Sequence, residues 1–248
     1  MIFRFVVPCL GLLLSLASLR AEENILPDSL AVPAGAEIST YPEPRDDWRS
    51  RVQSNFDASR NKTIDLIFDG DSITDRWQST GQEIWKQRYG SLNVFDFGIS
   101  GDQTQHVLWR IARGQLDGLD PKLVVLMIGT NNSGRDTPQQ IADGVKAIID
   151  EYLKGCPHAH LLLLAIFPRS ANAADPVRAK LTATNQLLAN FAGDRVTYLD
   201  IGAKFLGADG SLSPDIMPDF LHPSAKGYQI WADAIQPIID QYMGAPAK

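Results

Sequence analysis

The feature that most constrains the fold of this chain is the alternation of short apolar runs with longer amphipathic stretches. The run at residues 123–128 (LVVLMI) is apolar on both faces. Strands of this kind are typical of a parallel sheet that is covered on both sides, because neither face meets water. The same reasoning predicts strands at 64–68, 93–97, 123–128, 161–167 and 196–200, and helices at 46–60, 82–89, 103–113, 138–154, 177–191 and 224–242. The chain is therefore predicted to be an α/β protein, a three-layer α/β/α sandwich with a five-stranded parallel sheet.

Local signals support several of the helix starts. Thr137-Pro138-Gln139-Gln140 offers a capping threonine, proline at the first helical position and glutamine at the third. Ser224 is placed to cap the last helix. In the first helix, Trp48, Val52 and Phe56 are spaced four apart and predict one buried face.

The N-terminus differs from the rest of the chain. Arg4 precedes a short apolar run that ends at Leu19, which suits a signal peptide at residues 1–21 better than a spanning helix. Cleavage after Ala17 or Ala21 fits the pattern, and an uncleaved N-terminal anchor is the alternative. The expected organisation is then an extended, proline-rich lead-in at 22–45 and one domain at 46–243.

Charge and cysteine content narrow the class of partner. Loss of residues 1–21 removes Arg4 and Arg20, so the formal net charge falls from −6 to −8. This sign argues against nucleic acid and anionic membranes as partners, and we expect no stable membrane insertion after signal removal. Cys9 leaves with the signal and Cys156 stays alone, so no zinc-type pattern exists. No metal and no cofactor are predicted, and a monomer and a homodimer are both compatible with the sequence.

Three polar, glycine-containing loops follow the first three predicted strands, at residues 69–72, 98–102 and 129–132. The carboxyl ends of parallel strands lie at one edge of a sheet, where ligands bind in open α/β folds. We therefore expect these loops to converge on one surface.

These loops and a segment near the C-terminus contain a serine and the groups that would activate it as a nucleophile. Ser72 lies where a strand gives way to a helix, and Asp219 precedes His222 by three residues, close enough to hold its imidazole. The N–H groups of Ser72 and Gly101 and the amide of Asn131 are candidate donors to an oxyanion. Each residue alone is as well explained by a cap, a turn or a surface position. Their order and their positions at strand ends favour catalysis.

The chain resembles the SGNH (GDSL-like) hydrolases, and within them the catalytic subunits of platelet-activating-factor acetylhydrolase and related secreted bacterial esterases. The residues that carry the resemblance are Gly70-Asp71-Ser72, Gly101, Gly129-Thr130-Asn131 and Asp219-Phe220-Leu221-His222. The resemblance implies a flavodoxin-like fold, a triad of Ser72, Asp219 and His222, and an oxyanion hole built from Ser72, Gly101 and Asn131. The lead-in and the sequence Ile73-Thr74-Asp75-Arg76-Trp77 depart from the acetylhydrolase subunits, which leaves the substrate open.

Three other residues near the motifs have competing explanations. Asp71 is expected to make structural hydrogen bonds, and His106 is expected to pack within a helix. Arg169 follows the fourth strand, where either a substrate contact or a surface salt bridge would explain it.

The leading functional hypothesis is hydrolysis of short-chain, above all acetyl, carboxylic esters of small molecules or glycans through an acyl-enzyme, by a secreted or periplasmic protein. One alternative is a lipid or thioester acylhydrolase, which would need an apolar groove beside Ser72. The other alternative is a non-catalytic glycan-binding or assembly module on the same fold.

Overall fold

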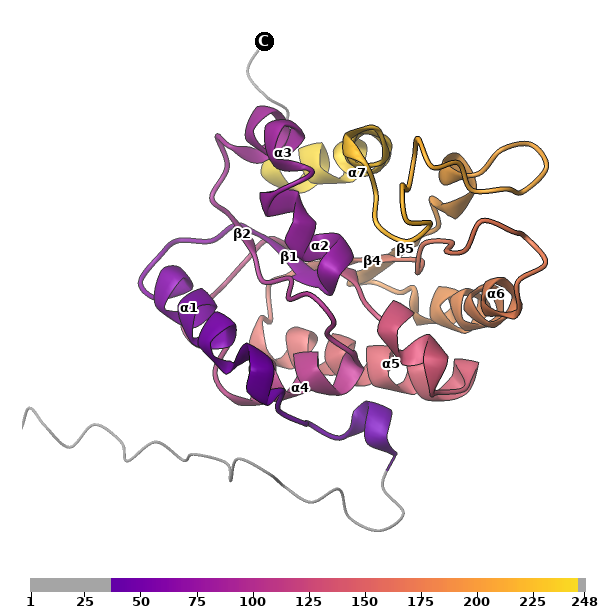
Figure 1. Cartoon of the computed structure of the whole chain (residues 1–248). Coiled ribbons are helices and arrows are strands. Elements are labelled where there is room, and N and C mark those ends of the chain that lie inside the picture. Colours follow the sequence, from indigo (N-terminus) through magenta and orange to yellow (C-terminus); the bar gives the residue numbers. More distant parts are fainter. Residues whose placement is uncertain (1–36, 245–248) are drawn as a thin grey trace, which may run out of the picture.

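The computed structural model describes residues 37–244 and contains a five-stranded parallel sheet (Figure 1). The strands are β1 (Leu66–Gly70), β2 (Val94–Asp96), β3 (Leu123–Met127), β4 (His160–Leu164) and β5 (Val196–Leu199). Their order is β2-β1-β3-β4-β5, and neighbours are parallel. The predicted parallel sheet and α/β fold are confirmed. Because β2 and β3 lie on opposite sides of β1, the winding reverses at β1, which is where ligands bind in sheets of this type.

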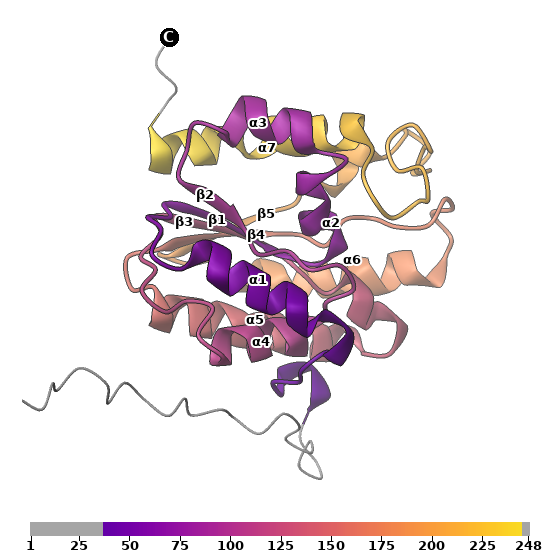
Figure 2. The ribbon, with the colours of Figure 1, turned by 60° about the vertical axis from the view of Figure 1, so that its left-hand side comes forward.

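Helices cover both faces of the sheet (Figure 2). The helices are α1 (Arg49–Ser59), α2 (Ser72–Asp75), α3 (Gln82–Tyr89), α4 (Thr104–Ala112), α5 (Pro138–Gly155), α6 (Pro176–Leu188) and α7 (Ala225–Met243). One face packs against α4, α5 and α6, and the other packs against α3 and α7. Alternate strand residues enter the two cores: Val124 enters the first, and Leu123 and Val125 enter the second. Burial on both faces explains why these runs are apolar throughout.

The predicted helix caps are present. Thr137 Oγ1 accepts a hydrogen bond from the Gln140 backbone N–H (3.3 Å), and Gln140 Oε1 accepts one from the Thr137 N–H (2.8 Å). Ser224 Oγ accepts from the Gly227 N–H at the start of α7 (3.3 Å). These side chains pair backbone N–H groups that a helix leaves free at its first turn.

The predicted helix at residues 46–60 is divided into a short 3₁₀ helix, η2 (Asp46–Trp48), and α1. The expected apolar face was partly wrong. Val52 is buried, but it shares its face with Asn55 and Ser59, while Trp48 and Phe56 are only half-buried. The buried Asn55 side chain accepts a hydrogen bond at its Oδ1 from the Arg51 guanidinium (2.9 Å), which satisfies one end of the amide.

The expected signal peptide and residues 22–36 of the expected lead-in lie outside the described residues. The N-terminal segment, residues 37–45, contains the 3₁₀ helix η1 (Ile38–Thr40) and contacts α4 and α5. Thr104 Oγ1 donates to the Ser39 carbonyl (2.8 Å), and the Glu43 N–H donates to the Gln105 carbonyl (3.1 Å). The segment is thereby attached to the beginning of α4. Over residues 37–244, none of the helices combines the length and the apolar character that a membrane span needs.

Candidate functional site

The three loops that were expected to converge do so at the carboxyl edge of the sheet. The Ile99 N–H donates to the Gly70 carbonyl (3.2 Å), which joins the loop after β2 to the end of β1. Asn131 Nδ2 donates to the Asp102 carbonyl (2.9 Å), which joins the loop after β3 to the loop after β2. Side chains from three different strand ends therefore face one surface.

Ser72 is the first residue of α2 and directly follows a tight turn after β1. Asp71 caps this helix, because its Oδ1 accepts a hydrogen bond from the Ile73 N–H (2.9 Å). Glycine is required at position 70, since a Cβ there would lie 2.2 Å from the Met127 carbonyl oxygen. This close approach places Ser72 at the strand end with only 7% of its surface exposed.

A hydrogen-bonded chain links Ser72, His222 and Asp219. Ser72 Oγ lies 2.8 Å from His222 Nε2, and His222 Nδ1 lies 2.6 Å from Asp219 Oδ2. The second oxygen of Asp219 accepts hydrogen bonds from the backbone N–H groups of Leu221 (3.1 Å) and His222 (2.7 Å). Phe220, at φ 56°, makes the turn that brings these groups together. The acid and the imidazole are thus oriented by one four-residue turn.

The hydrogen bonds of this turn also determine the protonation state of Asp219. Partial burial raises the pKa of Asp219, but hydrogen bonds from the His222 backbone and side chain outweigh it and lower the pKa to about 2. Asp219 is therefore ionised at neutral pH. An anionic acceptor at Nδ1 keeps the ring proton on that nitrogen and leaves Nε2 free to accept the serine proton.

The turn that carries His222 is attached to the helix that carries Ser72 through α7. The Tyr228 hydroxyl donates to the Ile73 carbonyl (2.7 Å). The Tyr228 ring packs against Trp77, with centroids 4.5 Å apart, in the core between the sheet and α7. These contacts hold His222 and Ser72 at a fixed separation although they are 150 residues apart in the sequence.

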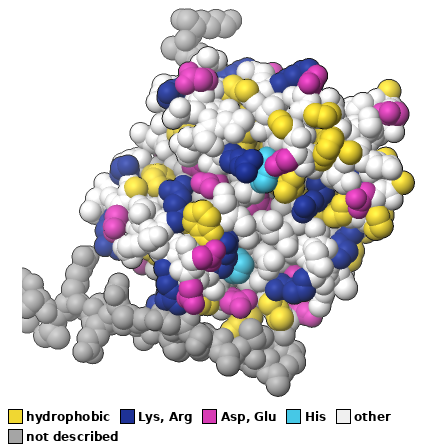
Figure 3. Space-filling model, in the orientation of Figure 1, with side chains coloured by type: hydrophobic (Ala, Val, Ile, Leu, Met, Phe, Trp, Pro, Cys, Tyr) yellow, Lys and Arg dark blue, Asp and Glu magenta, His cyan; other side chains and the backbone are white. Residues whose placement is uncertain are grey.

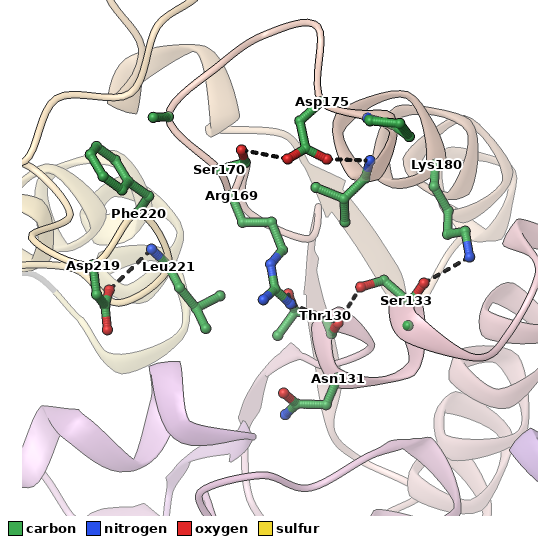
Figure 4. Close-up of a pocket in the computed structure, with 14 residues that line it drawn as sticks. Thr130, Asn131, Ser133, Arg169, Ser170, Asp175, Lys180, Asp219, Phe220 and Leu221 are labelled. Atoms are coloured by element: carbon green, nitrogen blue, oxygen red, sulfur yellow. Dashed lines mark hydrogen bonds between the residues drawn. The ribbon is translucent and has the colours of Figure 1, made fainter.

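At this edge the backbone N–H groups of Ser72 and Gly101 have no acceptor within residues 37–244. Gly101 has φ 83°, a conformation that side-chain-bearing residues rarely adopt. Asn131 uses one Nδ2 proton on the Asp102 carbonyl and faces the neighbouring cavity (Figure 4). Hydrogen-bond donors without an acceptor, placed at neighbouring strand ends, are able to bind an oxyanion.

A cavity of about 910 Å³ opens beside the site. Its lining includes Asn131, Asp219, Arg169, Asp175 and Lys180 (Figure 4). On the same face of the molecule, basic and acidic side chains gather around a histidine (Figure 3). The volume is in the range of a small-molecule site.

Arg169 faces this cavity and makes no salt bridge within the described residues. Its Nη1 has only long contacts with Thr130, 3.3 Å to the carbonyl oxygen and 3.4 Å to Oγ1. Of the two explanations that the sequence left open, the surface salt bridge was therefore wrong for residues 37–244, and the position of Arg169 fits a substrate contact.

The other residues near the motifs act structurally, as expected. Asp71 is fully buried and caps α2, and burial raises its pKa to about 7. His106 lies on α4, where its Nδ1 accepts from the Gln103 N–H (2.9 Å), and burial lowers its pKa to about 3. Cys156 is a buried free thiol. In the part of the chain that the structure describes, no three His, Cys, Asp or Glu side chains gather as a metal site requires.

A buried ionic network beneath the loops was missed by the sequence analysis. Arg110 Nη2 donates to Asp69 Oδ1 (2.9 Å) and Arg110 Nε donates to Asp102 Oδ2 (3.0 Å). Gln115 and Tyr152 also hydrogen-bond to Asp69 Oδ2, at 2.7 and 2.5 Å. The sequence feature that could have indicated this network is Arg110 itself, a charged residue on the buried side of α4 with Val107 and Ile111.

Comparisons with known proteins agree with this geometry. A sequence model of the GDSL-like lipase/acylhydrolase family matches residues 68–230. Platelet-activating factor acetylhydrolase IB subunit alpha1 from Homo sapiens is 37% identical over 207 residues, which cover 80% of this chain and 88% of that protein. Subunit alpha2 from Rattus norvegicus is 36% identical over 185 residues, 74% of this chain and 79% of that protein.

Solved structures share the fold at lower sequence identity. A GDSL-like lipase from Bacteroides thetaiotaomicron superposes with a TM-score of 0.63 at 19% identity, covering 79% of this chain and 98% of that one. An acetylxylan esterase from Geobacillus stearothermophilus superposes with a TM-score of 0.59 at 21% identity, covering 72% and 94%. Together with the family match, these relatives show that the chain belongs to the GDSL-like lipase/acylhydrolase family and is an ester hydrolase of the SGNH type.

Proposed function

We propose that the protein is a serine esterase that hydrolyses short-chain, above all acetyl, carboxylic esters through an acyl-enzyme on Ser72. The observation that carries this proposal is the hydrogen-bonded chain from Ser72 Oγ through His222 (2.8 Å) to Asp219 (2.6 Å). A serine hydroxyl is a weak nucleophile alone and needs such a base with an orienting acid.

In the first half of the reaction, Ser72 Oγ bonds to the ester carbonyl carbon while His222 Nε2 takes the hydroxyl proton. The developing oxyanion accepts hydrogen bonds from the Ser72 N–H, the Gly101 N–H and Asn131 Nδ2. The bond to the leaving alcohol then breaks, and His222 returns the proton to that alcohol. Water repeats the sequence on the acyl-enzyme, which releases the carboxylic acid and restores Ser72.

The cavity beside the site supports a polar leaving group. Its lining includes the polar residues Arg169, Ser170, Asp175 and Lys180, and the Arg169 guanidinium has only long contacts with Thr130. This guanidinium can donate hydrogen bonds to hydroxyl-rich molecules such as glycans. A long acyl chain would leave the Arg169 guanidinium with only its long contacts to Thr130, which costs free energy. The names of two relatives, an acetylhydrolase and an acetylxylan esterase, also refer to removal of acetyl groups.

We also infer that the protein acts outside the cytoplasm, in the periplasm or after secretion. The support is the basic and apolar pattern of residues 1–21, which fits a signal peptide.

Labelling with a fluorophosphonate tests the nucleophile. The native protein should be modified at Ser72, and modification and ester hydrolysis should both be lost in Ser72→Ala. The matched control is Ser79→Ala, an exposed serine that follows η3 (Arg76–Gln78) and should be labelled like the native protein. Undiminished labelling of Ser72→Ala would reject the nucleophile assignment.

Rates on matched esters test the substrate class. We expect p-nitrophenyl acetate to be hydrolysed faster than the octanoate, and acetylated sugars or xylan faster than an acetylated phospholipid or an acyl thioester. A preference for octanoate, phospholipid or thioester would replace the proposal with a lipid or thioester acylhydrolase. Purified protein without residues 1–21 serves for all of these assays.

A further inference from the structure

The N-terminal segment ends in an arginine that reaches the loop carrying Gly101. Arg45 Nη1 donates a hydrogen bond to the Ser100 carbonyl (2.8 Å) and lies 3.3 Å from Asp102 Oδ1. The guanidinium occupies the space where a side chain on Gly101 would begin, since a Cβ there would lie 2.9 Å from Arg45 Nη1. Its side chain is only 19% exposed, so the contact is substantially shielded from water.

The bonded carbonyl belongs to the peptide that supplies an oxyanion donor. The Ser100 C=O and the Gly101 N–H are the two ends of one trans peptide group, so they point in opposite directions and turn together. A hydrogen bond that holds the carbonyl therefore also fixes the direction of the N–H. A cationic donor on the oxygen further polarises the group and makes its N–H a stronger donor.

We propose that Arg45 is a positioning residue of the active site, which holds and polarises the Ser100–Gly101 peptide so that its N–H faces the oxyanion. The N-terminal segment then contributes to catalysis. This inference rests on the proposed function, because it requires Gly101 to serve as an oxyanion donor.

Arg45 is itself held in place on its outer side. Its Nη2 donates to Asp47 Oδ2 (2.9 Å), and its guanidinium carbon lies 5.6 Å from the centre of the Trp48 ring. Backbone attachment of the N-terminal segment to α4, through the Glu43 N–H, restrains the approach of the side chain. One guanidinium nitrogen of Arg45 thus bonds the exposed Asp47, and the other bonds the loop that carries Gly101.

The same loop connects Arg45 to the other oxyanion donors. Arg45 lies close to Asp102 Oδ1, and Asp102 Oδ2 accepts a hydrogen bond from Arg110 Nε (3.0 Å). The Asp102 carbonyl accepts a hydrogen bond from Asn131 Nδ2 (2.9 Å). Ser100 Oγ donates to Asp75 Oδ2 (2.6 Å) at the end of α2. A shift of residues 100–102 would therefore disturb two of the three proposed donors. Lysine cannot replace this function, because its single ammonium lacks the planar fork.

The test compares Arg45→Ala, Arg45→Gln and Arg45→Lys with Arg88→Ala, an arginine that pairs with Asp233 on the face of α3 and α7. On p-nitrophenyl acetate we expect Arg45→Ala to lower kcat about ten- to hundredfold, below the loss expected for removing a donor itself, with KM changed less than about twofold. Binding of an alkyl boronate, whose tetrahedral adduct places an oxygen in the hole, should weaken by the same factor. Added methylguanidine should restore part of the lost kcat.

Arg45→Gln retains a neutral donor and should fall between the native protein and Arg45→Ala, and it keeps the test valid if Arg45→Ala does not fold. An unchanged kcat in folded Arg45→Ala or Arg45→Gln would overturn the proposal. A loss that appears in KM alone, or boronate affinity equal to that of the native protein, would also overturn it. Ser72→Ala separates the two hypotheses: if this variant remains active, the proposed function itself fails, whatever the Arg45 variants show.

Discussion

At the residue scale, Asn131 offers the most direct test of the proposed oxyanion hole. Its amide is held by the Asp102 carbonyl at 2.9 Å and keeps a second proton for substrate. We expect Asn131→Ala to lower kcat by about 10²–10³ with little change in KM, because the lost bond forms mainly in the transition state. Steady-state kinetics on p-nitrophenyl acetate provide the measurement. Asn190→Ala, at an exposed amide in the 3₁₀ helix η5 (Ala189–Phe191), is the control, and equal kcat in both variants would remove Asn131 from the mechanism.

Arg169 should affect substrate binding more than the chemical step. Its guanidinium faces the cavity, and only long contacts with Thr130 occupy it within the described residues. We expect Arg169→Ala to raise KM for acetylated sugars about tenfold, the scale of one hydrogen bond to a charged group, with kcat within about threefold. Arg88→Ala, distant from the cavity, is the matched control. An unchanged KM would return Arg169 to a structural role.

The candidate site could be predicted only where its residues form short local patterns. Ser72 is marked by the turn between a strand and a helix, and Asp219 and His222 are three residues apart. Arg45 and Arg110 were missed because their partners Ser100 and Asp69 lie 55 and 41 residues away. Nothing local marks such pairs, since the fold alone brings them together.

At the scale of elements, apolar runs predicted which segments enter the core better than where strands end. Residues 165–167 were predicted as part of a strand, yet β4 ends at Leu164 while these three residues stay buried outside the ladder. Conversely, β1 continues through Asp69 to Gly70, beyond the predicted end at 68. Asp69 is tolerated in this buried strand because Arg110 donates a hydrogen bond to its carboxyl group (2.9 Å). An apolar run therefore indicates burial, whereas pairing depends on neighbours that the sequence does not show.

The packing of α7 on α2 can be tested with one hydroxyl group. Tyr228→Phe removes the hydrogen bond to the Ile73 carbonyl and leaves that buried acceptor unpaired. We expect the free energy of unfolding to fall by about 1–3 kcal/mol, the usual cost of such a group, and kcat to fall less than in Asn131→Ala. Urea denaturation gives the first quantity. Tyr242→Phe, also on α7 but only half-buried, should be nearly neutral, and equal stability of the two variants would contradict the coupling.

For the whole molecule, the pH dependence of stability should reflect carboxyl groups buried near the site. Burial raises the pKa of Asp96 to about 8, although the Gly98 N–H (2.8 Å) and Gln78 (3.2 Å) hydrogen-bond to it. Burial likewise raises the pKa of Asp71 to about 7 and that of Asp102 to about 6. From about pH 4 up to its own folded pKa, each of these groups thus keeps in the folded protein a proton that the unfolded chain has released. Their stabilising effect is complete below the unfolded pKa of about 3.9 and is lost as pH rises through the folded pKa values.

Asp96→Asn isolates one part of this dependence. Asparagine stays neutral at every pH and retains an oxygen that can accept from the Gly98 N–H. The variant should therefore lose less unfolding free energy than the native protein when urea denaturation at pH 5 is compared with pH 8. Asp57→Asn, at an exposed position on α1, should keep the native difference. If Asp96→Asn shows the same difference as Asp57→Asn, the carboxyl group of Asp96 is ionised in the folded protein at both pH values, and another group must account for the loss of stability.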